Sequence, residues 1–148
     1  YAYILFELIN KVGVFTYKDT DKGPEFELIQ LVEPLSDQLD PMHDCGAAMT
    51  MSPDGKYLFT STAGDNSVAM FSINPEDGKL TKEFALPISG EYPKDIALFP
   101  DGKHLASINH EGSISFFKID YEKGLLVMSD RSITVNEPNC CEIVKIGD

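Results

Sequence analysis

Tryptophan is missing from this sequence, arginine occurs only as Arg131, and cationic side chains are scarce. Lys and Arg number 12 against 24 Asp and Glu, so the formal net charge at pH 7 is -12. Nucleic-acid binders neutralise phosphates with clustered Lys and Arg, and anionic membrane surfaces attract the same residues. No such cluster occurs here, so we expect neither nucleic acid nor a membrane surface as a partner.

Long hydrophobic runs and helical periodicity are missing as well. No apolar stretch approaches the roughly 20 residues that span a bilayer, and no basic-then-apolar leader precedes the first strand-like run. That run already includes Tyr1, so we expect a trimmed chain or a part of a longer one. No segment shows the 3.6-residue period of an amphipathic helix, which favours an all-β fold.

Cysteine is limited to Cys45, Cys140 and Cys141, an odd number for a disulfide framework. Two adjacent cysteines on a strand point to opposite faces, which is poor geometry for binding one metal ion. We therefore expect reduced thiols in the cytoplasm. The turn aspartates lack the spacing of a calcium loop, and no phosphate-binding glycine loop, Ser-His-Asp order or CxxC pair occurs. Neither a metal ion nor a cofactor is predicted.

What the sequence does contain is an internal repeat. The segment 52–58 (SPDGKYL) returns 47 residues later as 99–105 (FPDGKHL). The segment 66–73 returns as 112–119, and residues 10–17 are a third copy of it. Ordered copies of two segments at one spacing indicate a repeated structural unit.

The local pattern of each copy is that of β-structure. Pro-Asp-Gly favours a tight turn, and the alternation in 12–14 and 114–116 has the period of two of a half-buried strand. Four antiparallel strands per repeat are typical of a β-propeller blade. The predicted strands are 2–7, 11–17 and 25–32, then 47–51, 57–61, 67–72 and 80–86, then 95–99, 104–108, 113–119 and 125–135, and finally 141–146.

These strands divide the single domain 1–148 into about three blades. Blade 1 (1–35) lacks its first strand, blade 2 (45–88) and blade 3 (93–136) are complete, and 141–146 is a first strand without a blade. Propellers typically close with about 4–8 blades. We therefore expect a partial propeller whose partners are either the remaining blades of a longer chain or other copies of itself.

Five motifs occur in one order along the chain: 47–59, 64–71, 92–97, the second Pro-Asp-Gly-Lys at 100–103, and 137–140. In this order they resemble the seven-bladed β-propeller lactonase family, which includes propeller-type bacterial 6-phosphogluconolactonases and the fungal carboxy-cis,cis-muconate cyclase. The absence of tryptophan argues against a WD repeat. The resemblance covers nearly the whole chain and corresponds to the family's C-terminal three blades.

The resemblance also implies site residues. Glu7 stands where the family has the glutamate of an Asn-Glu-Leu segment, a proposed catalytic acid or base, so Glu7 is the predicted catalytic residue. Lys94 replaces the arginine of a Pro-Arg pair and keeps a cation for substrate binding without the bidentate fork. Ala63 stands near another family arginine, and His43, ahead of a first strand, is a second predicted substrate contact. A solvated strand-end glutamate and an exposed loop histidine are the alternatives.

Two classes of function follow from the resemblance. The first is a lactonase of carbohydrate metabolism that hydrolyses a sugar lactone in the complete propeller, or a lactonising enzyme like the muconate cyclase. Its partner is a small lactone or sugar acid. The family's Arg-His pair and a further histidine would precede Tyr1, so this chain alone is expected to be inactive. The second is a non-catalytic propeller that binds a small ligand or a protein.

Overall fold

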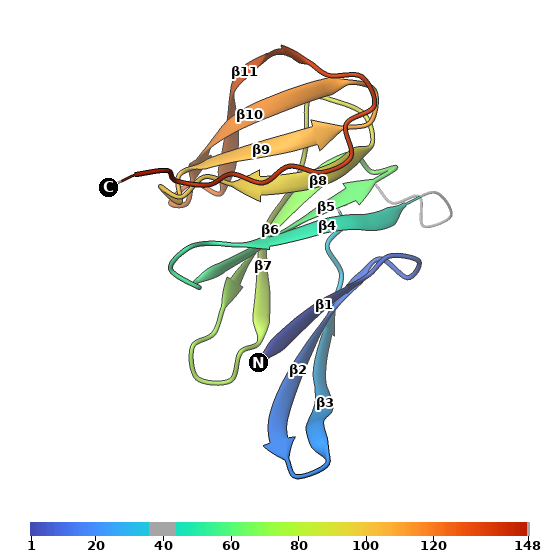
Figure 1. Ribbon diagram of the computed structural model, residues 1–148, viewed down its shortest axis with the longest axis vertical. Helices are drawn as coiled ribbons and strands as arrows, with labels where there is room; N and C mark the ends of the chain where they lie inside the picture. Colours follow the sequence, from blue (N-terminus) through green and yellow to red (C-terminus); the bar gives the residue numbers. More distant parts are fainter. Residues whose placement is uncertain (36–43, 148) are drawn as a thin grey trace.

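The computed structural model describes residues 1–35 and 44–147, and this part of the chain forms eleven β-strands and no helix (Figure 1). The strands are β1 (Ala2–Phe6), β2 (Lys11–Thr20), β3 (Gly23–Val32), β4 (Cys45–Met51), β5 (Tyr57–Ala63), β6 (Ser67–Ile73), β7 (Leu80–Pro87), β8 (Pro93–Leu98), β9 (His104–Asn109), β10 (Ser113–Asp120) and β11 (Leu125–Thr134).

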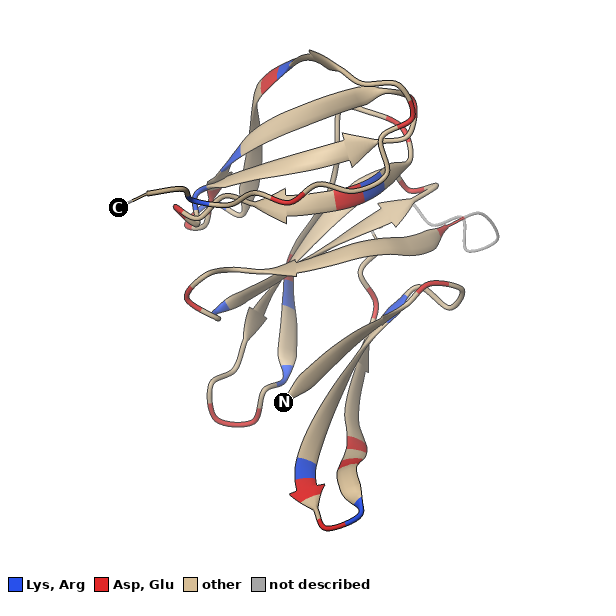
Figure 2. Ribbon diagram, viewed as in Figure 1, with Lys and Arg blue, Asp and Glu red and all other residues tan. Residues whose placement is uncertain are grey.

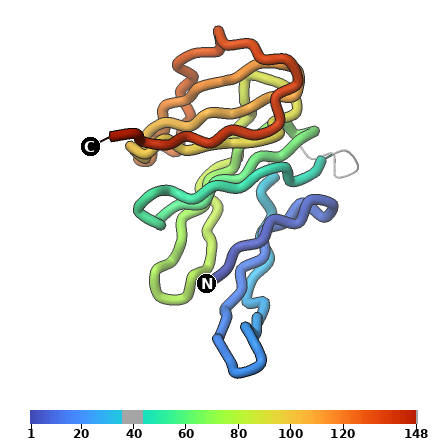
Figure 3. Tube along the Cα trace, in the orientation of Figure 1, coloured from blue at the N-terminus to red at the C-terminus, as the bar shows by residue number. Residues whose placement is uncertain are grey.

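The strands form three antiparallel sheets, one for each predicted blade. Blade 1 has the order β1-β2-β3, blade 2 the order β4-β5-β6-β7, and blade 3 the order β8-β9-β10-β11, so strands adjacent in the sequence pair within every sheet. Figures 1 and 3 show the three sheets following one another like sectors of a fan. The prediction of an all-β, partial β-propeller is confirmed.

The repeat is visible in the backbone as well as in the sequence. A residue with a positive φ stands directly before β2, β6 and β10, which are the third strands of their blades when the missing first strand of blade 1 is counted. These residues are Asn10 (φ 46°), Asn66 (φ 50°) and Gly112 (φ 103°). Asn and Gly tolerate this region better than other residues. The same chain reversal therefore leads into β2, β6 and β10.

Two apolar clusters join the blades face to face. In β5 the adjacent residues Leu58 and Phe59 are both buried, and they point to opposite faces of the sheet. Leu58 belongs to the cluster with Val12 of blade 1, and Phe59 to the cluster with Leu105 of blade 3. Each large apolar side chain buried in this way contributes about 1.5–3 kcal/mol to stability. Blade 2 is thus covered on both faces.

Several strand ends differ from the prediction. The β2–β3 hairpin extends to Thr20 and Gly23, because a turn at residues 21–22 lets three further residue pairs form. The first strand, β1, is one residue shorter than predicted and ends at Phe6, so Glu7 lies in the turn between β1 and β2. The first strands of blades 2 and 3 begin earlier than predicted, at Cys45 and Pro93.

The predicted strand at 141–146 is not formed in this structure. Residues 141–147 have no strand pairing, because none of the described sheets offers them the second strand of a following blade. Instead, the Cys141 amide donates a hydrogen bond to Asp95 Oδ2 at 2.7 Å. This contact holds the terminal segment beside β8 (Figure 3).

Charged residues lie mainly at turns and strand ends, with acidic and basic residues intermixed along the backbone (Figure 2). The two Pro-Asp-Gly-Lys turns are examples, since Lys56 pairs with Asp54 at 3.4 Å and His104 pairs with Asp101 at 2.7 Å. Within residues 1–35 and 44–147 there is no helix of the length and apolarity that a membrane crossing requires.

Candidate active site

A cleft of about 550 Å³ lies where the end of β1 meets the edge strands β4 and β8. All three blades and the terminal segment contribute to it. The side chains with polar or ionisable groups come from each of these parts. The residues that line it are Leu5, Glu7, Cys45, Gly46, Ala47, Ala48, Met49, Ala63, Tyr92, Lys94, Asp95, Asn139 and Cys140.

Two equivalent β-bulges shape the floor of the cleft. In β4 the register shifts between Gly46 and Ala48, and in β8 it shifts between Pro93 and Asp95, so Ala47 and Lys94 are the extra residues. Bulges occur beside active sites because they redirect a side chain. The Lys94 side chain therefore leaves the regular alternation of its strand at the cleft.

A buried serine ties the two bulges together. Ser61 of β5 is fully buried, and its hydroxyl accepts a hydrogen bond from Ala48 N at 3.1 Å. The same hydroxyl donates to the Pro93 carbonyl oxygen of the neighbouring blade at 3.3 Å. The spacing between β4 and β8 is thus set by a polar contact as well as by apolar packing.

Glu7 is fixed through its backbone while its carboxylate is exposed. Its carbonyl oxygen accepts hydrogen bonds from Asn10 N at 3.2 Å and from Gly46 N at 3.1 Å. The first bond closes the turn after β1, and the second crosses from blade 1 to blade 2. The backbone from which the Glu7 side chain extends is therefore fixed, and the carboxylate can reach the cleft.

Lys94 and Tyr92 interact across the mouth of the cleft. The Lys94 ammonium lies 4.9 Å from the centroid of the Tyr92 ring, within the range of a cation–π contact. The neighbouring Cys45 side chain, through its charge and hydrogen bonding, burial and the Glu7 carboxylate raise the pKa of Tyr92 above its usual value. The phenol is therefore a neutral hydrogen-bond donor at physiological pH.

The terminal segment forms one wall of the cleft through Asn139 and Cys140. Asp95 holds this wall, because its Oδ2 accepts from the Cys141 amide while its Oδ1 accepts from Ile96 N at 2.9 Å. Burial, assisted by the Asp95 carboxylate, raises the pKa of the Cys141 thiol. This thiol therefore remains protonated at neutral pH.

The structure brings together two of the three predicted site residues. Glu7 and Lys94 line the same cleft, whereas His43 lies outside the described residues. Ala63 also borders the cleft, and its side chain is 1% exposed, so no cation reaches the site from that position. In residues 1–35 and 44–147, His, Cys, Asp and Glu side chains nowhere gather in threes that could hold a metal ion.

Sequence reasoning missed Tyr92 and Cys45 as members of the site. The repeat contained the signal, because the two residues occupy equivalent positions 47 residues apart, each two residues before the extra residue of a bulge. Their pairing across two blades depends on how the sheets are arranged. A one-dimensional pattern does not contain that information.

Comparisons with known proteins agree with the fold and with the resemblance. The family model of the seven-bladed β-propeller lactonases matches residues 1–143. A protein of Bacillus subtilis strain 168 named 6-phosphogluconolactonase is 29% identical over 145 residues, which cover 97% of this chain and 41% of the relative. The protein of the same name from Formosa agariphila is 37% identical over 93 residues, 61% of this chain and 26% of the relative. The chain thus spans well under half the length of these relatives.

Solved structures show the same relationship. A Lactobacillus plantarum protein superimposes with a TM-score of 0.81 at 26% identity, over 93% of this chain and 40% of that one. A Bacteroides fragilis protein, for which the name 6-phosphogluconolactonase is provisional, gives a TM-score of 0.82 at 30% identity over 97% of this chain and 38% of its own. These shares fit three blades out of seven. The chain belongs to the seven-bladed β-propeller lactonase family.

Proposed function

We propose that the complete propeller to which these blades belong is a lactonase of the 6-phosphogluconolactonase type. The observation that carries the proposal is that Glu7 and Lys94, far apart in the sequence, line one cleft. A carboxylate and an ammonium group in one cleft suit a substrate with a reactive ester and an anionic group. The reduced cysteines are consistent with a cytoplasmic location, which belongs to the same proposal.

In the proposed mechanism, Glu7 moves a proton. Its carboxylate accepts a proton from a water molecule as the water oxygen bonds to the lactone carbonyl carbon. The tetrahedral intermediate then breaks its bond to the ring oxygen, and protonated Glu7 returns the proton to that oxygen. The product is the open-chain sugar acid. Lys94 binds the anionic group of the substrate as a point charge.

Substitution of the two residues in the complete propeller tests these roles. Glu7→Gln should reduce kcat by about 10²–10⁴-fold, the usual contribution of a general base, and Lys94→Met should raise KM for 6-phosphogluconolactone. Glu27→Gln and Lys18→Met are matched controls, because both residues are exposed on blade 1 away from the cleft. Unchanged kinetics in Glu7→Gln would remove Glu7 from the mechanism.

We also propose that the 148-residue chain alone has negligible activity. Among the residues that line the described cleft, Lys94 is the single cation, and the lining comes from three blades and the terminal segment. Hydrolysis of 6-phosphogluconolactone by the isolated chain should not exceed the spontaneous rate. Measurable hydrolysis that disappears in Glu7→Gln would contradict this expectation and would identify the site at the same time.

A non-catalytic propeller is the second candidate, and Ala63 favours it. A methyl group borders the cleft at the position near which the family often has an arginine, so the site has less positive charge to stabilise a developing oxyanion. Calorimetry with 6-phosphogluconate, the product, distinguishes the two. Binding without turnover in the complete propeller supports the second candidate.

A further inference from the structure

Tyr92 has a backbone conformation that a bulky side chain rarely adopts. Its φ is 58°, in the left-handed region, and the residue is neither Gly nor Asn. Such conformations persist only where the surroundings impose them, and they cluster at functional sites. The contacts that impose this one are therefore informative.

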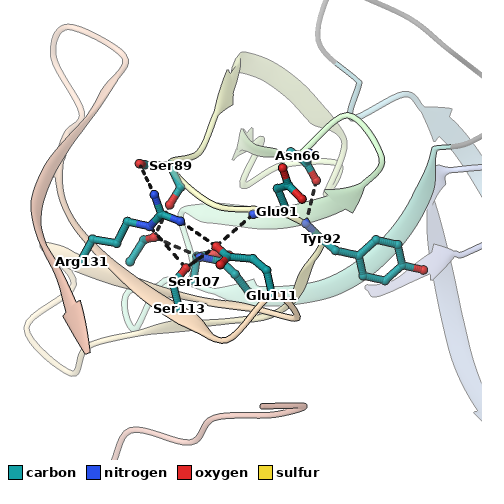
Figure 4. Close-up of polar contacts among 10 residues, drawn as sticks. Asn66, Ser89, Glu91, Tyr92, Ser107, Glu111, Ser113 and Arg131 are labelled. Carbon is teal, nitrogen blue, oxygen red and sulfur yellow. Dashed lines mark hydrogen bonds and ion pairs between the residues drawn. The ribbon is translucent and has the colours of Figure 1, made fainter. Parts of the chain in front are cut away.

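A network of hydrogen bonds holds the loop that ends at Tyr92 (Figure 4). The Tyr92 amide donates to Asn66 Oδ1 at 2.8 Å, and the Tyr92 carbonyl oxygen accepts from His110 N at 2.9 Å. The preceding residue, Glu91, donates its amide to Glu111 Oε1 at 3.3 Å. Two neighbouring blades thus fix the backbone on both sides of Tyr92.

The single arginine strengthens the same network. Arg131 Nη2 donates to Glu111 Oε1 at 2.8 Å and orients the carboxylate that holds the loop. Its Nη1 lies 3.5 Å from Ser89 Oγ, and the Ser89 carbonyl oxygen accepts a bond from Ser115 Oγ at 2.6 Å. Arg131 does not line the cleft, so its contribution is to the rigidity of the loop.

The network directs the Tyr92 side chain toward the cleft. Figure 4 shows the ring pointing away from the hydrogen-bonded cluster. On that side, the ring lies 4.9 Å from the Lys94 ammonium and lines the cleft together with Cys45. A strained backbone is thus maintained at the residue that contacts the candidate substrate-binding cation.

We propose that Tyr92 is a positioning residue of the cleft, which holds the Lys94 ammonium where it meets the anionic group of the substrate. This inference rests on the proposed function. The ring limits the rotamers of Lys94, so less side-chain entropy is lost when the substrate binds. If Tyr92 had only a structural role, its replacement by glycine would raise the stability of the protein and would not change substrate binding.

The test compares variants of the complete propeller with two substrates. Tyr92→Gly should keep or raise Tm, because glycine adopts the left-handed region without strain, yet it should raise KM for 6-phosphogluconolactone about three- to fivefold. KM for the lactone that lacks the phosphate should stay within about twofold of its original value, since the lost contact acts through Lys94. Tyr92→Phe retains the ring and should retain KM.

Two further variants keep the test decisive. Glu137→Gly removes the backbone strain of another left-handed residue (φ 45°), which does not line the cleft. This variant should change Tm without changing KM. Tyr92→Asn tolerates the same backbone and lacks the ring, so it replaces Tyr92→Gly if that variant folds poorly. If Lys94→Met raises KM while Tyr92→Gly and Tyr92→Asn do not, Tyr92 has no positioning role. If Lys94→Met also leaves KM unchanged, the proposed binding role of Lys94 fails together with this inference.

Discussion

Tyr121 illustrates how one side chain joins two repeats. Its hydroxyl donates a hydrogen bond to the carbonyl oxygen of Gly102 at 2.7 Å, and its ring lies 4.6 Å from that of Tyr57 in the neighbouring blade. Burial, with smaller effects from the Asp54 carboxylate and other neighbours, raises the pKa of Tyr121 to about 12. The neutral phenol is the form that the fold stabilises.

We predict that this phenol makes stability depend on alkaline pH. The folded-state pKa of Tyr121 exceeds the unfolded value, so its contribution is complete below about pH 10 and is lost as the pH rises toward about 12. Denaturant unfolding across this range should show the loss, and ultraviolet titration should show a tyrosine that ionises near pH 12 and that is missing in Tyr121→Phe. Tyr121→Phe should weaken the alkaline loss and should lower stability by about 1 kcal/mol at neutral pH, because the hydrogen bond to Gly102 is gone. An unchanged alkaline profile in that variant would exclude Tyr121 as the cause.

At the residue scale, the sequence predicted part of the candidate site. Glu7 and Lys94 could be named because they align with family motifs, and the structure places both on one cleft. Tyr92 could not be named, since its importance lies in a positive φ and in neighbours on blade 2, Asn66 and Cys45. Neither property follows from residue type.

At the element scale, the Pro-Asp-Gly turns mark the start of the second strand in blades 2 and 3. Gly55 and Gly102 both have left-handed conformations, with φ of 70° and 64°. Ser52 and Asp54 complete the first turn, because Ser52 Oγ donates to Asp54 Oδ1 at 2.7 Å and the Lys56 amide donates to the same oxygen at 3.1 Å. The turn geometry therefore depends on one glycine and on the Asp54 carboxylate oxygen that accepts both bonds.

Substitution of Gly55 measures how much this geometry contributes. No atom lies within 4 Å of the Cβ position at Gly55, so Gly55→Ala introduces backbone strain without a steric clash. We predict a loss of about 1–2 kcal/mol in the free energy of unfolding for Gly55→Ala, measured by urea denaturation. Gly55→Asn is the matched variant, and its loss should be smaller because Asn tolerates the left-handed region. Equal losses would mean that the conformation of Gly55 is not the cause.

Strand existence could be predicted from the sequence, but strand ends could not. The internal repeat and its turns located β1 to β11, and the alternation in two of the repeated segments identified them as strands. The ends depend on turn chemistry: Thr20 Oγ1 accepts from Lys22 N at 3.3 Å and donates to the Gly23 carbonyl oxygen at 2.6 Å, which prolongs the β2–β3 hairpin. The predicted strand at 141–146 had a suitable pattern but lacks a pairing partner within the described sheets.

At the scale of the whole molecule, the two outer blades present apolar side chains to solvent. On blade 1, the strand registers place seven of them on the face directed away from blade 2. Tyr17, Phe26 and Leu28 of this group are 50%, 56% and 47% exposed. On blade 3, Val127 and Ile133 of β11 are 53% and 44% exposed. The seven residues of blade 1 are Ile4, Phe6, Phe15, Tyr17, Phe26, Leu28 and Leu31.

We predict that the 148-residue chain associates with itself when it is studied alone. Exposed apolar faces and an unpaired edge at β1 favour contact with another chain, so light scattering should give a mass that rises with concentration. Phe26→Glu should reduce the association, because the charge would be buried in the contact. Leu8→Glu is the matched control, since Leu8 is 88% exposed in the turn after β1 rather than on the blade face. A well-folded monomer at every concentration would show that the apolar faces of this three-blade arc need no partner.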